Sequence, residues 1–437
     1  MLLDESKIRQ DDGIKIKLSD EVFDGFINNA CEYFTILESD LGELTPRDAI
    51  DVLSIITDFR EYFVSESDWD CLTLQILDMI RRGVSRSMYQ DIASFSGMTH
   101  IGYNTYGLSL ISPKINDFFK GIVNVLLDDL ASYTKKSGGE EFNTTGNYEV
   151  IKGLSGPLSF LLMLGTEKKI EDPIRKIVNI LIRRSKTKSV KDCTVTGWHY
   201  FPSATESLYM TEEAKNGVVN YSLSHGMGGP LAALSLAHKN GYRADGLDEA
   251  INCLVSEFMK AVYYYDDIAC WPGRITFEQY IGQEEIVKTP KQMSWCYGSV
   301  GILRVLYLYG RSMPDEKISQ FALDELIKIA SMPVRDYLLS QPIVCHGFAG
   351  TAEIMNLMYL DTGLPDFYIK TYEMIEKSIS YNIERYTELE KRLAVERGMP
   401  VQIKLHNHLE GYSGIIQTIL SIIKGVPNAN DKRLLIN

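Results

Sequence analysis

Residues 345–358 read CHGFAGTAEIMNLM, in which two glycines stand three positions apart and a mostly apolar run follows directly. This G-x-x-G element with its apolar run occurs five times along the chain, and a blurred earlier copy lies at residues 97–107. Self-similarity of this kind is typical of repeat architectures built from one supersecondary unit. The five copies begin at Gly153, Gly226, Gly298, Gly347 and Gly411.

The spacing of the copies indicates pairs of helices. Successive first glycines are 73, 72, 49 and 64 residues apart, and each interval can hold two helices with their connections. One helix of each pair is strongly apolar, which predicts inner helices surrounded by more polar outer ones. Glycine at each turn lets the chain enter the inner helix with backbone close to backbone. We therefore predict an all-α fold, a closed α/α toroid with a double barrel of inner and outer helices.

Closure of the ring would place all five turns at one end of the barrel, around a common cavity. An open solenoid of helical hairpins is the alternative, and the spacing alone does not exclude it. The irregular spacing and the clustering of reactive residues at the turns favour closure.

The rest of the chain reads mostly as amphipathic helix. Thr45 is a predicted N-cap followed by Pro46 at the first helical position. Helices are also predicted over residues 247–263, 317–330 and 368–386, where apolar residues recur at three- and four-residue steps.

Two segments, residues 185–220 and 264–293, break the helical pattern. Aromatic and β-branched residues punctuated by glycine and proline predict short strands and loops there. We predict a single toroid over residues 1–437, in which both segments are insertions at the active-site end and one forms a small β-containing subdomain.

Composition narrows the class of protein and of partner. The 437 residues carry a net charge of −13, which argues against nucleic acid and favours a cationic peptide. Seven scattered cysteines, an odd number, suggest no disulfide framework and hence a reducing compartment. We find neither a signal peptide nor a run of about 18 apolar residues that could cross a membrane. A cytoplasmic protein with no transmembrane segment is expected.

The repeated turns differ in their chemistry. The second turn carries His225, the third Cys296 and Tyr297, and the fourth Cys345 and His346, each one or two residues before its first glycine. A catalytic zinc site has three protein ligands and one open position, and thiolate and imidazole suit that metal. Two neighbours such as Cys345 and His346 can reach one metal from a turn, and a helix N-terminus favours the thiolate form. The alternative is that the two cysteines are small buried core residues.

Three motifs resemble those of one enzyme family. S-H-G-x-x-G at 224–229, W-C-Y-G at 295–298 and C-H-G-x-A-G at 345–350 occur in the order found in the lanthionine synthetase C family of lanthipeptide cyclases. The resemblance covers roughly residues 97–423 and includes Trp271-Pro272. It implies a closed α/α toroid and Zn²⁺ as cofactor. The residues that it assigns are Cys296, Cys345 and His346 as zinc ligands, His225 as catalytic acid/base and Tyr297 as the tyrosine that follows the first zinc cysteine.

The resemblance also implies a reaction and partners. Cysteine thiolates of a dehydrated ribosomal precursor peptide would add to dehydroalanine or dehydrobutyrine and form lanthionine or methyllanthionine thioether rings. Zinc would activate the thiol, and His225, whose ordinary pKa is about 6.5, would protonate the α-carbon after attack. A dehydratase and an ABC exporter are the implied protein partners, through which the chain would be peripheral at the membrane.

At two positions the sequence departs from the family pattern. Glu149 stands where the family has an aspartate before V-I-x-G-L-x-G, so its carboxylate either orients His225 or is displaced by the longer stem. Gln292 stands four residues before Cys296, near the position of a family arginine. Glu149 is retained as a candidate catalytic residue. Glu410, directly before Gly411, is a weaker candidate for lining the site.

Other functions stay open at this level. A zinc-bearing scaffold could bind a peptide without turnover, and a related enzyme could add glutathione to dehydrated residues. A carbohydrate enzyme on the same fold would need two opposed carboxylates, whereas the turns offer cysteine and histidine. The remaining loop histidines, His199, His406 and His408, are expected to be structural or solvated.

Overall fold

The computed structural model describes residues 2–85, 91–137, 143–144, 146–165, 167–202, 212–425, 427 and 429–437. For residues 212 and 213 only the backbone is described. It is mostly helical, and the described residues fall into two compact units. Unit 1 comprises Met1–Tyr89, Asn104–Phe119 and Ala330–Asn428, and unit 2 comprises Gln90–Tyr103, Lys120–Ile329 and Ala429–Asn437. Each unit is built from apolar helices that follow the repeated turns and from amphipathic helices packed against them. No helix among the described residues combines the length and apolar character needed to cross a membrane.

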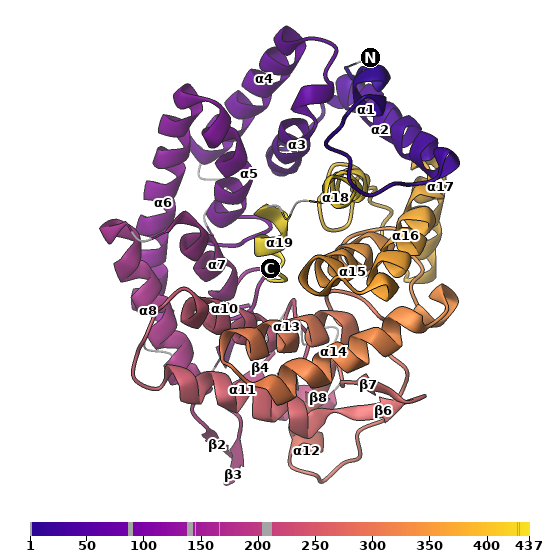
Figure 1. Ribbon diagram of the computed structural model, residues 1–437. Coiled ribbons are helices and arrows are strands. Elements are labelled where there is room, and N and C mark those ends of the chain that lie inside the picture. The colour runs from indigo at the N-terminus through magenta and orange to yellow at the C-terminus, as the bar shows by residue number, and fades with distance from the viewer. Residues whose placement is uncertain are drawn as a thin grey trace. The chain divides into compact units, whose positions relative to one another are not determined.

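In unit 1 the helix that follows the last turn lies centrally. Helix α18 packs against α15 on one side and against α2 and α3 on the other, and α16 pairs with α15 (Figure 1). Every residue of α15 from Phe348 to Met358 is buried, as expected for an inner helix. The helices of this unit are α1 (Glu5–Arg9), α2 (Asp20–Asp40), α3 (Pro46–Asp58), α4 (Glu66–Ser85), α15 (Phe348–Thr362), α16 (Pro365–Ile379), α17 (Ile383–Glu396) and α18 (Tyr412–Lys424).

In unit 2 three motif helices lie side by side. Helix α10 packs between α7 and α13, and α8 and α11 cover α7 and α10 (Figure 1). The residues of α7 from Ser155 to Leu162 are all buried, whereas α8 buries one apolar face. The helices are α7 (Ser155–Leu164), α8 (Lys168–Ser185), α10 (Gly228–Lys239), α11 (Leu247–Ala261), α12 (Phe277–Tyr280), α13 (Ser299–Ser312) and α19 (Ala429–Arg433). The ranges of α5 (Met98–Ile111), α6 (Pro113–Ser137) and α14 (Glu316–Ser331) include a unit boundary.

Backbone hydrogen bonds connect each repeated turn to the next turn within a unit. Each bond joins the segment just before one motif helix to the segment just before another, so the turns in a unit share one end of its helix layer. The bonds run from Ser94 N to Ile151 O (2.9 Å), Val150 N to Ser224 O (3.1 Å) and Leu223 N to Cys296 O (3.0 Å) in unit 2, and from Cys345 N to Leu409 O (2.9 Å) in unit 1.

Close backbone approach explains the first glycine of the turns. A Cβ atom on Gly347 would lie 2.3 Å from the carbonyl oxygen of Gln341, six residues earlier, and Gly298 has the same relation to Gln292 at 2.2 Å. Gly97 repeats it with the carbonyl oxygen of Asp91 at 2.3 Å. The blurred sequence copy at 97–107 therefore contains the same turn as the clear copies.

Adding a methyl group at Gly97 is expected to destabilise the protein. In Gly97→Ala the new Cβ overlaps Asp91, and overpacking of this kind costs about 1–3 kcal/mol. Gly121→Ala is the control, because Gly121 lies in α6 with nothing within 4 Å of an added Cβ. A thermal melt of both variants tests this expectation, and equal melting temperatures would contradict it.

Both predicted insertions contain strands, and part of each joins one sheet. In this four-stranded sheet of order β1-β4-β5-β8, β5 from the first insertion pairs antiparallel with β8 from the second. Two separate hairpins, β2-β3 and β6-β7, are the other strand pairs among the described residues of unit 2. The strands are β1 (Asn143–Thr144), β2 (Lys188–Val190), β3 (Cys193–Val195), β4 (Tyr200–Phe201), β5 (Val218–Asn220), β6 (Tyr263–Tyr265), β7 (Ile268–Cys270) and β8 (Arg274–Thr276).

The local helix predictions hold with one exception. Thr45 caps α3 in a capping box with Asp48, as its sequence position predicts. The expectation of one helix over residues 368–386 is wrong, because α16 ends at Ile379 and α17 begins at Ile383. The Asn382 side chain accepts a hydrogen bond from the backbone of Arg385, and asparagine is among the best N-cap residues.

Candidate functional site

The second turn places His225 against Glu149. The side chain of His225 is 46% exposed and that of Glu149 is 1% exposed, with 2.9 Å between His225 Nδ1 and Glu149 Oε2. The carboxylate also accepts backbone hydrogen bonds from Ile151 (3.0 Å), Lys152 and Gly153 (3.0 Å). Because a carboxylate held in this way accepts from Nδ1–H, the proton-exchanging atom of His225 is Nε2. The longer stem of Glu149 therefore does not displace its carboxylate from His225.

Glu149 also changes the acidity of His225. Burial by itself would lower the pKa of His225, but the hydrogen bond and the negative charge of Glu149 outweigh it. The charge of Cys296 acts in the same direction, and the net result is a pKa raised above the ordinary value. More of the ring is consequently protonated near neutral pH than in a free histidine.

The third turn supplies Cys296 and Tyr297 beside this pair. The Cys296 side chain is buried, and the ring centroids of Tyr297 and His225 are 6.2 Å apart. Asn220 donates from Nδ2 to the Tyr297 hydroxyl at 3.1 Å. Its Oδ1 accepts from the backbone of Ser222 (2.9 Å), so the amide is held from both ends. Unit 2 thus gathers His225, Glu149, Tyr297 and Cys296 on adjacent turns.

The fourth turn, in unit 1, presents Cys345 and His346, both half-buried. His346 Nε2 lies 2.9 Å from Gln341 Oε1, and Gln341 Nε2 donates to Glu390 Oε1 at 2.7 Å. Since the amide nitrogen of Gln341 faces a carboxylate, its oxygen accepts from His346 Nε2–H. This tautomer leaves the lone pair on His346 Nδ1 available for a metal.

Among the residues that the structure describes, Cys296, Cys345 and His346 form a group of metal-ligand side chains. The group combines the cysteine of the third turn with the cysteine and histidine of the fourth. Two sulfur ligands and one imidazole are a donor set that suits zinc, with one position left for a substrate or water. The donor chemistry of the group therefore fits the metal that the motifs implied.

The other histidines mentioned above are buried and hydrogen-bonded, so they are structural and not solvated. A ring nitrogen of each bonds a protein oxygen: His199 to Asn216 O (3.0 Å), His406 to the Tyr33 hydroxyl (3.0 Å) and His408 to Gln417 Oε1 (2.9 Å). Burial lowers the pKa of His199 to about 4, which keeps the ring neutral.

Comparison with known proteins agrees with this arrangement of turns. A family model described as lanthionine synthetase C-like protein matches residues 60–435, which is most of the chain. The chain belongs to the lanthionine synthetase C-like family. Within that family it is similar to the nisin biosynthesis protein NisC of Lactococcus lactis subsp. lactis, with 26% identity over 267 residues. The match covers 58% of this chain and 61% of NisC, so the chain spans less than two thirds of that relative.

A solved structure shows the fold. The chain matches nisin cyclase with a TM-score of 0.74 at 19% sequence identity, over 94% of this chain and 96% of that one. For this member of the lanthionine synthetase C-like family, the expected all-α class, the α/α toroid and the small β-containing insertions are thereby confirmed.

Sequence reasoning missed the amide side chains that support the turns. Asn220 and Gln341 stand six residues before the first glycines of the second and fourth turns, and they contact Tyr297 and His346. Gln292 occupies the same place before the third turn. With Asn147 six residues before Gly153, an amide residue at this offset in four of the five turns was the available signal. The acid partner, Glu390, lies on α17 and gives no such signal.

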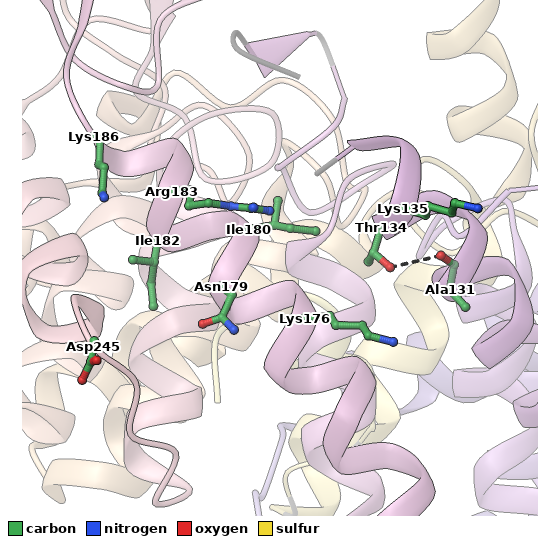
Figure 2. Close-up of a pocket in the computed structure, with 10 residues that line it drawn as sticks. All are labelled: Ala131, Thr134, Lys135, Lys176, Asn179, Ile180, Ile182, Arg183, Lys186 and Asp245. Atoms are coloured by element: carbon green, nitrogen blue, oxygen red, sulfur yellow. Dashed lines mark hydrogen bonds between the residues drawn. The ribbon is translucent and has the colours of Figure 1, made fainter. Parts of the chain in front are cut away.

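A cavity of about 850 Å³ in unit 2 lies apart from these residues (Figure 2). Its cationic side chains are Lys135, Lys176, Arg183 and Lys186, and Asp245 lines it from another segment. No candidate catalytic or metal-binding residue lines it, so it forms no part of the candidate site.

Proposed function

We propose that the chain is a zinc-dependent lanthipeptide cyclase that acts on a dehydrated ribosomal precursor peptide. The observation that carries this proposal is the Glu149–His225 pair, beside a cysteine of a group that can bind metal. Membership in the lanthionine synthetase C-like family supports the same activity.

In this proposal Cys296, Cys345 and His346 hold one zinc ion. When bound, the ion supplies Lewis-acid chemistry that lowers the pKa of a substrate cysteine thiol. Gln341 keeps the His346 proton on Nε2, so that Nδ1 stays free to be a ligand. The buried position of Cys296 limits the access of water to its sulfur.

His225 then acts as the acid of the addition. The peptide thiolate forms a carbon–sulfur bond at the β-carbon of a dehydroalanine or dehydrobutyrine, and the electron pair of the alkene moves to the α-carbon side. His225 Nε2 then protonates the α-carbon. The imidazole of His225 regains a proton from solvent or from the thiol that was ionised. Glu149 stabilises the protonated ring and fixes its orientation. Tyr297, held by Asn220, lies where it can position the peptide beside His225.

We further propose that residues 1–437 work as one toroid, with segments 185–220 and 264–293 at its active-site end. The proposed cellular setting is the cytoplasm, with a dehydratase that supplies the substrate and an ABC exporter that removes the product. Glutathione addition and a peptide-binding scaffold remain the competing functions. The contact between Glu149 and His225 favours an enzyme over a peptide-binding scaffold, because binding a peptide does not require a histidine whose pKa is raised by a carboxylate.

A cyclisation assay tests the function. The zinc-loaded protein is incubated with a dehydrated peptide that contains one cysteine, and free thiols are then alkylated and counted by mass spectrometry. Ring formation protects the thiol, so the alkylated fraction is expected to fall with time. Glutathione adducts formed in place of rings, in a reaction supplied with both thiols, would overturn the cyclase assignment.

Removing the charge of Glu149 is expected to move the pH profile. In Glu149→Gln the hydrogen bond to a negative charge that raises the pKa of His225 is lost, so this pKa falls. The proton needed for the addition is present below that pKa and lost above it. The alkaline limb of the cyclisation rate should therefore shift to lower pH than in wild type, while zinc content stays the same. An unshifted alkaline limb would show that His225 is not the titrating acid.

A further inference from the structure

A pocket of about 180 Å³ lies beside His346 in unit 1. Its walls come from the fourth and fifth turns, from α17 and from the segment that follows α17. His346 and Glu410, each directly before the first glycine of its turn, both line it. The pocket therefore opens at the end of the helix layer that carries the reactive turns.

The lining divides into an apolar and a polar part. Leu393 and Ala394 on α17 are half-buried, and Met399, which follows α17, is 62% exposed although it lines the pocket. The polar part includes a Lys404–Glu410 ion pair and Arg397, whose side chain forms no ion pair with any described residue. An apolar concave surface with a few polar groups is typical of a ligand-binding pocket.

The size and place of the pocket select its occupant. A volume of 180 Å³ equals the liquid volume of roughly six water molecules, which suits one medium-sized side chain. If the chain has the proposed function, a substrate cysteine binds beside His346. The Cα atoms of the residues next to that cysteine then lie about 3.8 Å from its own Cα atom. A neighbour on the His346 side must therefore lie in or over this pocket.

We propose that the pocket beside His346 binds the aliphatic side chain of a substrate residue that flanks the reacting cysteine. This inference rests on the proposed function and names the specificity-determining wall of the same site. Leu393, Ala394 and Met399 contact the aliphatic side chain, and Arg397 is placed to bond a peptide carbonyl. A flanking glycine is disfavoured, because it would leave this apolar wall uncovered.

Filling the pocket tests the inference. The full-length, zinc-loaded protein is titrated against a fluorescein-labelled peptide with one dehydroalanine and one cysteine flanked by leucine. Ala394→Trp and Met399→Asp are expected to weaken binding at least fivefold. The tryptophan fills the pocket, and the aspartate places a charge on its apolar wall. Val395→Trp and Val395→Asp are the matched controls, because Val395 is on the same helix, is 74% exposed and does not line the pocket. The controls should bind within twofold of wild type.

A second peptide separates failure of this inference from failure of the proposed function. Replacing the flanking leucine by glycine should weaken wild-type binding at least fivefold, because the buried aliphatic side chain is lost, and should have little effect in Ala394→Trp. Equal binding by the pocket variants and the controls would overturn the pocket assignment, whether or not rings form. Peptide binding with the expected pattern but no ring formation would instead overturn the cyclase proposal alone.

Discussion

Replacing Cys296 or Cys345 by alanine is expected to remove the zinc and to abolish ring formation. Wild-type protein should hold about one zinc per chain, because a Cys₂His set matches the preferred donors of this metal. With one sulfur ligand gone, two protein ligands remain, and the cyclisation rate should fall by more than the roughly 10–100-fold that outer-shell changes cost. Elemental analysis and the thiol-protection assay measure the two effects.

The matched control for the cysteine variants is Cys253→Ala. Cys253 is half-buried like Cys345 but lies on α11, outside the metal-ligand group. It should keep both zinc and activity. Wild-type protein that contains no zinc after purification without chelators, or zinc retained in both ligand variants, would disprove the assignment of the ligands.

Replacing His225 by asparagine has the second largest expected effect. Loss of a positioned acid typically costs about 10²–10⁴-fold in rate. Because His225 is not in the metal-ligand group, zinc content should be unchanged, and the labelled peptide should bind as in wild type. The variant therefore separates the cyclase from a scaffold that only binds peptide.

His238→Asn serves as the control for this experiment. His238 is on α10, the helix that follows the His225 turn, and its Nδ1 lies 3.2 Å from the carbonyl oxygen of Ser312. The His238→Asn variant should cyclise the peptide at the wild-type rate. If His225→Asn also cyclises at that rate, the α-carbon proton comes from another group, and loss of zinc in this variant would reveal a structural role for His225.

The fold could be predicted to a large extent because its signals are local. The turn glycines are required by backbone atoms only six residues away, as Gly298 and Gly347 show. Apolar runs directly after the turns become the buried motif helices, and the Thr45 cap satisfies backbone groups of its own helix. Interactions within one turn or one helix can be predicted from residues that are close together in the sequence.

The single wrong helix shows the limit of periodicity. Apolar spacing continues across residues 368–386, but Asn382 begins a new helix there. The buried faces of α16 and α17 follow one periodic pattern in the sequence, so only the cap could reveal the break. A side-chain hydrogen bond to the backbone outweighed the pattern at this position.

The sequence by itself determined the repeated turns, the class of fold and the types of reactive side chain that the turns carry. Only the tertiary structure decided that Glu149 contacts His225, 76 residues away, and that Glu390 fixes His346 through Gln341. It also decided that β5 and β8 unite two insertions in one sheet. The physical reason is that turns and caps are satisfied by nearby backbone, whereas these contacts depend on how distant helices pack.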